Sequence, residues 1–449
     1  MTTAAATATP PETDAAVATA RRRLVPFLVL MYLLAYLDRA NVAYAKQALQ
    51  LSIGISEAAF AFAAGIFFIG YAVFELPSNL ILHRIGARVW LSRIMVTWGL
   101  LAAAMAFVQG DTSFWVLRVL LGIAEAGFFP GVLLYLTYWF PARERAQILG
   151  LFYLSQPLCF ILGGPISGVL LDLDGAFGLH GWQLMFLVEG LAASLVGIWA
   201  FFYLTDRPRD AAWMPARQQA ALESAIAAEN ATKTARGAVK LGAIFRNPLL
   251  AHFALTYFCI AICGYGIAFY LPTQVSALLG TKVGLTVTLV TSIPWLCAFA
   301  VSAVWPGLAQ RTGRRRLFAV ISLVGAGLGM IASGYVPPLV AVMALCVSVA
   351  GLISAQPIFW TFPMGYFGGF AAAGGIAVIN ALGNLGGFVA PNLKVAAEGW
   401  FGTGQAGLWV IGGGALLASV LLALIPARAE LAAPASDAPG DAASREALA

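Results

Sequence analysis

Apolar residues follow one another in long runs along almost the whole chain, and short polar segments separate the runs. Each run is close to the roughly 20 residues that a helix needs to cross the hydrocarbon core of a bilayer. The pattern predicts an all-α integral membrane protein with twelve transmembrane helices. The predicted spans begin near Leu24, Glu57, Val89, Ser113, Ala146, Gly181, Leu249, Gly284, Leu317, Pro338, Ala371 and Gly407.

One long connection divides these spans into two halves of six helices each. We expect an N-terminal half at 24–205, a cytoplasmic central loop at 206–248 and a C-terminal half at 249–426. The Ala, Glu, Gln and Arg content of the loop predicts a surface helix after Pro215. Residues 1–23 and 427–449 have a composition typical of disorder, and we expect them to be cytoplasmic tails.

Composition excludes a soluble protein. Hydrophobic residues make up 61% of the chain and charged residues 10%, whereas an ordinary soluble domain carries about 25% charge. A soluble fold would leave too much apolar surface in water. The five cysteines lie inside apolar runs and the three histidines are far apart, so we expect neither a metal site nor a cofactor.

The basic residues outside the spans gather in every second connection, which sets the orientation. Only Lys46, Lys282 and Lys394 fall in the opposite loops. Cytoplasmic loops carry the excess of Lys and Arg, so both termini are predicted to be cytoplasmic. The net charge of +6 therefore reflects membrane topology, and no nucleic-acid partner is expected. The pattern R-x-G-x-R occurs at 84–88 and again at 311–315, which indicates two related halves, as in alternating-access carriers.

A charge inside a membrane span costs several kcal/mol and is a functional candidate by default. Four of the charged residues inside the predicted spans carry the functional argument. Asp38 and Arg39 are in the first span, and Arg118 and Glu125 are in the fourth. The helical rise places Asp38, Arg39 and Arg118 at similar depth. The four residues provide one acid–base pair, one further arginine and one deeper acid. They predict a site for protons and an anion, because a guanidinium matches a carboxylate, sulfonate or phosphate. The alternative is a set of structural ion pairs that hold the two spans together.

Polar and aromatic side chains at mid-span extend this set of candidates. Tyr36 and Tyr71 lie in the first two spans, and single tyrosines there serve helix packing more often than binding. Gln156 and Asn384 are stronger candidates for substrate binding, because they lie at mid-depth in equivalent spans of the two halves.

Several segments together resemble the major facilitator superfamily and, within it, the anion:cation symporter family. That family includes bacterial organic-anion and proton symporters for tartrate, phthalate, hydroxyphenylacetate, galactonate and sulfoacetate. The matching segments cover nearly the whole chain: 36–41 (YLDRAN), 67–79 (FFIGYAVFELPSN), 83–88 (HRIGAR), 122–131 (GIAEAGFFPG), 138–141 (YWFP), 203–208 (YLTDRP), 371–376 (AAAGGI) and 383–387 (GNLGG).

The resemblance implies a secondary active transporter that imports a small organic anion with protons by alternating access. Asp38 and Glu125 match the family's proton-handling acids, and Arg39 and Arg118 match the arginines that bear on the anion and on coupling. The positions associated with the substrate cavity match Tyr36, Tyr71, Gln156 and Asn384. The implied partners are the anion, protons and the lipid bilayer, for a multi-pass monomer in the bacterial inner membrane.

Two other classes of protein compete with this interpretation. An antiporter that exports a drug or metabolite belongs to the same superfamily, and residues 162–165 (LGGP) favour it weakly. A membrane-embedded enzyme would need a nucleophile–base set or metal-ligand spacing within the spans, and the sequence has neither. A non-transporting receptor or scaffold is the remaining alternative, and the sequence does not name the anion.

Overall fold

The computed structural model describes residues 10–235, 248–366 and 369–425, and these are helical apart from turns and short connections. The first half consists of α1 (Pro10–Ile53), α2 (Glu57–Ile85), α3 (Ala87–Ala104), α4 (Asp111–Glu125), α5 (Phe128–Trp139), α6 (Ala142–Tyr153), α7 (Ser155–Leu158), the π-helix η2 (Cys159–Gly163), α8 (Gly164–Asp172) and α9 (Gly181–Tyr203). The second half consists of α12 (Pro248–Leu279), α13 (Leu285–Arg311), α14 (Arg315–Ala332), α15 (Pro338–Tyr366), α16 (Gly369–Asn384), α17 (Gly386–Phe401) and α18 (Gln405–Ala423).

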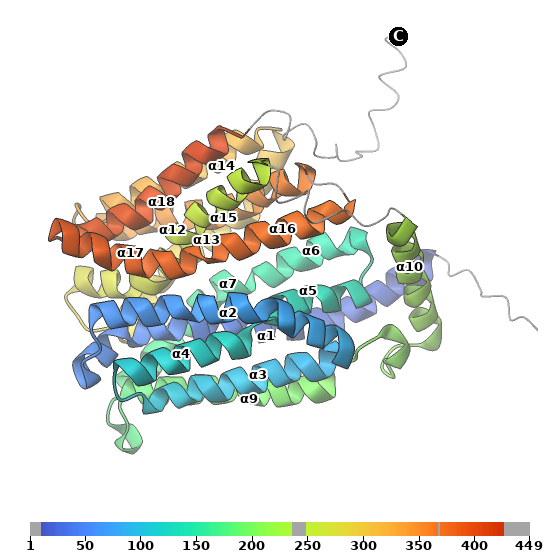
Figure 1. Ribbon diagram of the computed structural model, residues 1–449, viewed down its shortest axis with the longest axis horizontal. Helices are drawn as coiled ribbons and strands as arrows, with labels where there is room; N and C mark the ends of the chain where they lie inside the picture. The colour runs from blue at the N-terminus through green and yellow to red at the C-terminus, as the bar shows by residue number, and fades with distance from the viewer. Residues whose placement is uncertain (1–9, 236–247, 367–368, 426–449) are drawn as a thin grey trace, which may run out of the picture.

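The described residues contain 11 helical segments that are long and apolar enough to cross a membrane. The span expected to begin near Ala371 is built from two helices of 16 residues each, α16 and α17. They lie end to end (Figure 1), with a break at Leu385 between them. The fourth span is divided in the same way into α4 and α5, and the fifth into α6, α7, η2 and α8.

The two halves lie side by side as separate groups of helices (Figure 1). They pack along α2 with α17, α8 with α13, and α1 with α12. Glycines allow these close approaches. A Cβ at Gly168 of α8 would lie 2.1 Å from the Thr288 hydroxyl of α13, and one at Gly387 of α17 would lie 2.7 Å from the Phe68 ring.

The N-terminal segment corrects one prediction. Residues 10–23 were expected to be part of a disordered tail, but they form the first turns of α1. Their alanines are strong helix formers, and Ala16, Val17 and Ala20 are buried where α1 packs against α10 (Ala216–Ala235). Residues 1–9 and the predicted C-terminal tail, 427–449, lie outside the described residues.

The central loop contains the helix that was predicted after Pro215, which is α10. It lies at one end of the bundle (Figure 1). Leu222 and Ile226 are buried against the rest of the protein, and Glu229 forms an ion pair with Arg145 beside the start of α6. We call this end the α10 end, and the opposite end, where α1 leads into α2, the α1–α2 end.

Candidate substrate-binding site

A cavity of about 100 Å³ lies between the two halves. The first half contributes side chains from α1, α2, α5, α7 and η2, and the second half contributes α12, α15 and α16. Aromatic rings and neutral amides make up most of its wall. The lining residues that carry the argument are Tyr36, Arg39, Tyr71, Gln156, Tyr265, Gln356, Asn380 and Asn384.

Arg39 is the one charged side chain among the described residues that line this cavity. Its side chain is 18% exposed, and it is paired with Glu125, which is fully buried. Arg39 donates from Nε to Glu125 Oε1 at 2.8 Å, and its Nη2 is 2.5 Å from the same oxygen. Glu125 Oε2 has no hydrogen-bond partner. The guanidinium therefore reaches the cavity while it neutralises an acid behind the wall.

Aromatic rings surround the Arg39 guanidinium. Its Cζ lies 5.7 Å from the ring centre of Tyr36, 5.5 Å from that of Phe67 and 5.2 Å from that of Tyr71. Such rings attract a cation and exclude water from its sides. The charge is thus held in a low-dielectric pocket, where an anion that meets it is bound more strongly than in water.

The break between α4 and α5 positions Glu125. Glu125 is the last residue of α4, and the backbone turns at Ala126 and Gly127 before α5 begins. Gly127 has a φ of +85°, and a Cβ there would lie 2.2 Å from the Ser78 hydroxyl of α2. Both features require glycine. Gly122 similarly brings α4 against α2, since a Cβ there would lie 2.2 Å from the Phe67 carbonyl oxygen.

Arg118 does not line the cavity. It is 1% exposed, and its Nε donates to the carbonyl oxygen of Ala63 at 3.3 Å. Its guanidinium lies 4.8 Å from the ring centre of Phe67. The helical rise gave its depth correctly but not the direction of its side chain, which faces α2.

Asp38 also lies behind the cavity wall. It is 4% exposed and makes no ion pair with any residue that the structure describes. Its Oδ1 is 3.4 Å from Asn41 Nδ2, and its Oδ2 has no hydrogen-bond partner. Asp38 is not among the residues that line the cavity, whereas its neighbour Arg39 is. Arg118 and Arg39 both act electrostatically on Asp38, and the ion pair that the structure describes here joins Arg39 to Glu125.

The other predicted binding residues do line the cavity: Tyr36, Tyr71, Gln156 and Asn384. The Tyr265 hydroxyl donates to Asn384 Oδ1 at 3.1 Å, so α12 orients the amide that α16 contributes. Gln356 of α15 is a lining residue that the sequence analysis missed. The signal was present, because Gln356 is a single amide within a long apolar span.

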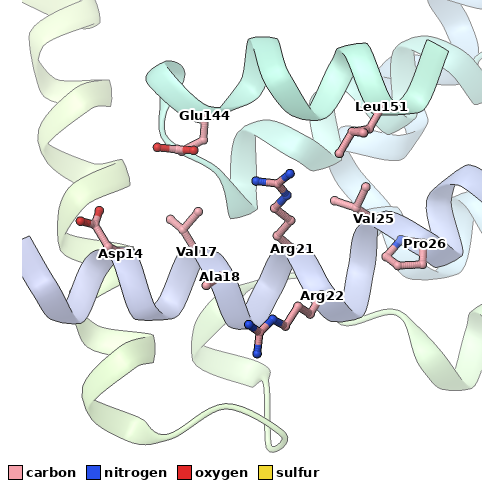
Figure 2. Close-up of a pocket in the computed structure, with 9 residues that line it drawn as sticks. All are labelled: Asp14, Val17, Ala18, Arg21, Arg22, Val25, Pro26, Glu144 and Leu151. Carbon is pink, nitrogen blue, oxygen red and sulfur yellow. The ribbon is translucent and has the colours of Figure 1, made fainter. Parts of the chain in front are cut away.

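A larger hollow, of about 730 Å³, lies near the α10 end and shares no residue with the central cavity. Figure 2 shows Arg21 pointing toward the helix that carries Glu144 and Leu151, whereas Arg22 points away from it. Asp14 and Glu144 offset the charge of these two arginines. This hollow therefore offers an anion no net positive charge, and the central cavity is the candidate substrate site.

At the α1–α2 end, the two halves are joined by a cluster of charged side chains. Lys46 Nζ lies 2.6 Å from Glu57 Oε1, and Lys394 Nζ from the second half lies 3.6 Å from the same atom. Lys394 also pairs with Glu398 at 2.8 Å. Both lysines lie beside the ring of Tyr270, at 4.6 and 4.1 Å from its centre. This cluster closes the α1–α2 end in the conformation described here.

Further polar contacts between the halves lie at the same end. Gln47 Oε1 accepts from the Val283 amide at 2.8 Å, and Asp172 Oδ2 accepts from the Leu285 amide at 2.9 Å. Both amides belong to the connection between α12 and α13 or to the first turn of α13. Because these bonds cross between halves, opening this end requires them to break.

Two groups of membrane helices that meet around a central, partly charged cavity are the arrangement of a membrane carrier. The sequence model of the Major Facilitator Superfamily matches residues 28–391. The chain therefore belongs to the major facilitator superfamily and is a multi-pass transporter of the bacterial inner membrane, not an enzyme.

Known proteins of the superfamily match most of the chain. The inner membrane transport protein RhmT of Escherichia coli is 42% identical over 91% of this chain and 95% of its own. A putative tartrate transporter of Agrobacterium vitis is 41% identical over 90% of each chain. A quinolone resistance transporter of Acinetobacter baumannii is 38% identical over 91% of this chain and 94% of its own.

Solved structures show the same fold. The xylose transporter XylE from E. coli, in a partially occluded inward-open conformation, matches with a TM-score of 0.72 at 17% identity, over 92% of this chain and 98% of that one.

Proposed function

We propose that this transporter imports a small organic anion, a carboxylate or sulfonate, together with protons by alternating access. The observation that carries the proposal is the position of Arg39, which reaches the cavity and also pairs with the buried Glu125. An anion that enters the cavity meets this guanidinium first, and a planar fork suits a carboxylate.

Coupling follows from the shared arginine. When the anion takes the Arg39 guanidinium, Glu125 is left buried without its cation. A buried, unpaired carboxylate is costly, and a proton relieves that cost. Anion binding and proton binding therefore favour each other, as linkage requires. Asp38, which is buried without an ion pair, is the second proposed proton-handling acid. Arg118, which is buried behind the cavity wall, adds a positive charge to the electrostatic potential at the site.

The remaining lining residues favour a small polar anion. The amides of Gln156 and Asn384, on opposite halves, can donate hydrogen bonds to hydroxyl or carboxylate oxygens. The cavity of about 100 Å³ is smaller than the roughly 300–1,000 Å³ of a site for a drug-sized ligand. The relative that is named a putative tartrate transporter makes tartrate the first anion to test.

The test is uptake of labelled tartrate into proteoliposomes, with and without an inwardly directed pH gradient. We expect the gradient to drive accumulation, and the protonophore-treated vesicles to equilibrate without accumulating. A panel of small carboxylates and sulfonates, screened by thermal stabilisation of the purified protein, replaces tartrate if tartrate does not bind. If no member of the panel is accumulated under the gradient, the proposal is wrong.

The second candidate is an antiporter that exports a drug or metabolite. It is supported by the quinolone resistance transporter among the relatives and by the aromatic side chains of the cavity wall. In the same vesicles, an antiporter would accumulate its substrate when the proton gradient is directed outward, because the substrate and the protons move in opposite directions. The sign of the pH effect therefore separates the two candidates.

A further inference from the structure

Glu189 of α9 is a buried acid that the proposed anion site does not use. It is 5% exposed and forms no ion pair with any residue that the structure describes. Ser167 Oγ of α8 donates to Glu189 Oε1 at 2.7 Å, and Glu189 Oε2 has no hydrogen-bond partner. An acid in this position is much more stable with a proton than without one, because no cation offsets its charge.

Asn41 lies near both this acid and Asp38. Asn41 follows Asp38 by one turn of α1 and is 1% exposed. Its Nδ2 is 3.4 Å from Asp38 Oδ1, and its side chain also lies near the Glu189 carboxyl. Two buried carboxyl groups, one on α1 and one on α9, therefore lie near the same side chain, and each retains an oxygen without a hydrogen-bond partner.

Among the residues that the structure describes, no cation interacts with Glu189. The other titratable groups that interact with it are Asp38 and Tyr44 of α1 and Cys159 of η2. At the adjacent Gly190, α9 packs closely on α3, since a Cβ there would lie 2.4 Å from the Ala103 amide nitrogen.

Asp38 also interacts with Glu125, Arg118 and Arg39, so two arginines offset its charge, whereas none among the described residues offsets that of Glu189. Neighbouring carboxyl groups disfavour each other's ionised form, so the two titrate as a coupled pair.

We propose that Glu189 is a proton-binding site of the transporter and that its protonation is coupled to that of Asp38. The inference rests on the proposed proton symport and assigns a further acid to it. In this arrangement the anion binds at the Arg39–Glu125 pair, and the Asp38–Glu189 pair binds a proton behind the cavity wall. All four of these side chains belong to the first half.

The direct test is infrared difference spectroscopy of the full-length protein in lipid, titrated with pH. A protonated carboxyl group gives a C=O stretching band that the carboxylate lacks. We expect Glu189→Gln to remove one such band from the wild-type spectrum, and Asp38→Asn to shift the pH at which that band disappears. Ser167→Ala is the matched control, because it removes one hydrogen bond from the acid and should shift the band's frequency without removing it. A spectrum unchanged by Glu189→Gln overturns the proposal.

A second measurement uses the unmodified chain, in case Glu189→Gln does not fold. A hydrophobic carbodiimide reacts with protonated carboxyl groups in apolar surroundings, and mass spectrometry locates the product. We expect Glu189 to be labelled, with labelling that falls as pH rises. Absence of labelling, or labelling independent of pH, contradicts a titrating Glu189.

Transport separates this inference from the proposed function. Glu189→Gln should reduce accumulation driven by a pH gradient at least tenfold, while exchange of labelled for unlabelled anion continues. If wild type itself shows no gradient-driven uptake, the proposed symport is wrong. If wild type is driven by the gradient and Glu189→Gln accumulates equally well, only the role of Glu189 is wrong.

Discussion

Replacing Arg39 with lysine asks whether the anion is held by a guanidinium fork or by positive charge alone. Arg39 directs two nitrogens, Nε and Nη2, at one oxygen of Glu125, and the same fork is available to a substrate carboxylate. Lysine keeps the charge but presents it as a single point. Arg39→Lys should therefore preserve folding, because a cation still lies opposite Glu125, but it should weaken anion binding.

The size of the effect follows from the bond that is lost. A hydrogen bond to a charged group contributes about 1.5–3 kcal/mol, and each 1.4 kcal/mol is tenfold in affinity. The dissociation constant should therefore rise by roughly 10- to 100-fold. Isothermal titration of the purified variant with tartrate, or with the anion found by thermal stabilisation, measures it directly.

Arg118→Lys is the matched control, since Arg118 is buried away from the cavity wall. It should leave affinity within about threefold of wild type, well under the loss of one charged hydrogen bond. It should lower thermal stability, because the bond from Nε to the Ala63 carbonyl is lost. If Arg39→Lys binds the anion like wild type while Arg118→Lys does not, the cavity is not the anion site.

Three further predictions test the fold and the closed end. Glu57→Gln should loosen the α1–α2 end, because Glu57 lies beside both Lys46 and Lys394, and an impermeant thiol reagent should then label a cysteine placed at Asn392 more strongly. Glu398→Gln, whose ion pair lies within one half, should increase the labelling less. Equal labelling of the two variants would exclude the cluster as a gate. Gly127→Ala should lower the melting temperature, because a left-handed conformation costs a residue with a side chain about 1–2 kcal/mol and because Ser78 occupies the position of the new Cβ. Gly150→Ala should not lower it, since a Cβ at Gly150 has no neighbour within 4 Å. Equal melting temperatures of the two variants would refute the backbone strain at Gly127. Deleting residues 223–233 should reduce the yield of folded protein, because α10 packs on α1, while well-folded protein with much weaker binding would contradict a purely structural α10.

The sequence predicts the membrane spans and the cavity residues well for a physical reason. A helix in lipid must satisfy its own backbone, so an apolar run of sufficient length has one stable structure. Polar residues such as Gln156 and Asn384 are then exceptional within their spans, and both line the cavity. The split of one span at Leu385 is not visible in hydropathy, because the residues on both sides of the break are mostly apolar.

The contacts that a side chain makes with neighbouring helices are harder to predict than the depth of the residue along its own helix. The rise per residue placed Arg118 near Asp38, but depth alone does not say which neighbour a side chain faces. Arg118 bonds to α2 and Arg39 pairs with Glu125, because close glycine contacts at 122 and 127 set how α4 lies on α2. The helical start of α1 was missed because its stability comes from packing on α10, a contact distant in sequence.

The central claim is that the anion displaces Glu125 from Arg39, so that binding brings a proton with it. The measurement is proton uptake when the anion is added to purified protein in weakly buffered solution near neutral pH. We expect wild type to take up protons in proportion to the anion bound, and Glu125→Gln, which keeps a hydrogen-bonding group beside Arg39, to bind the anion with less proton uptake. Anion binding without proton uptake by wild type, or with undiminished uptake by Glu125→Gln, would contradict the exchange at Arg39.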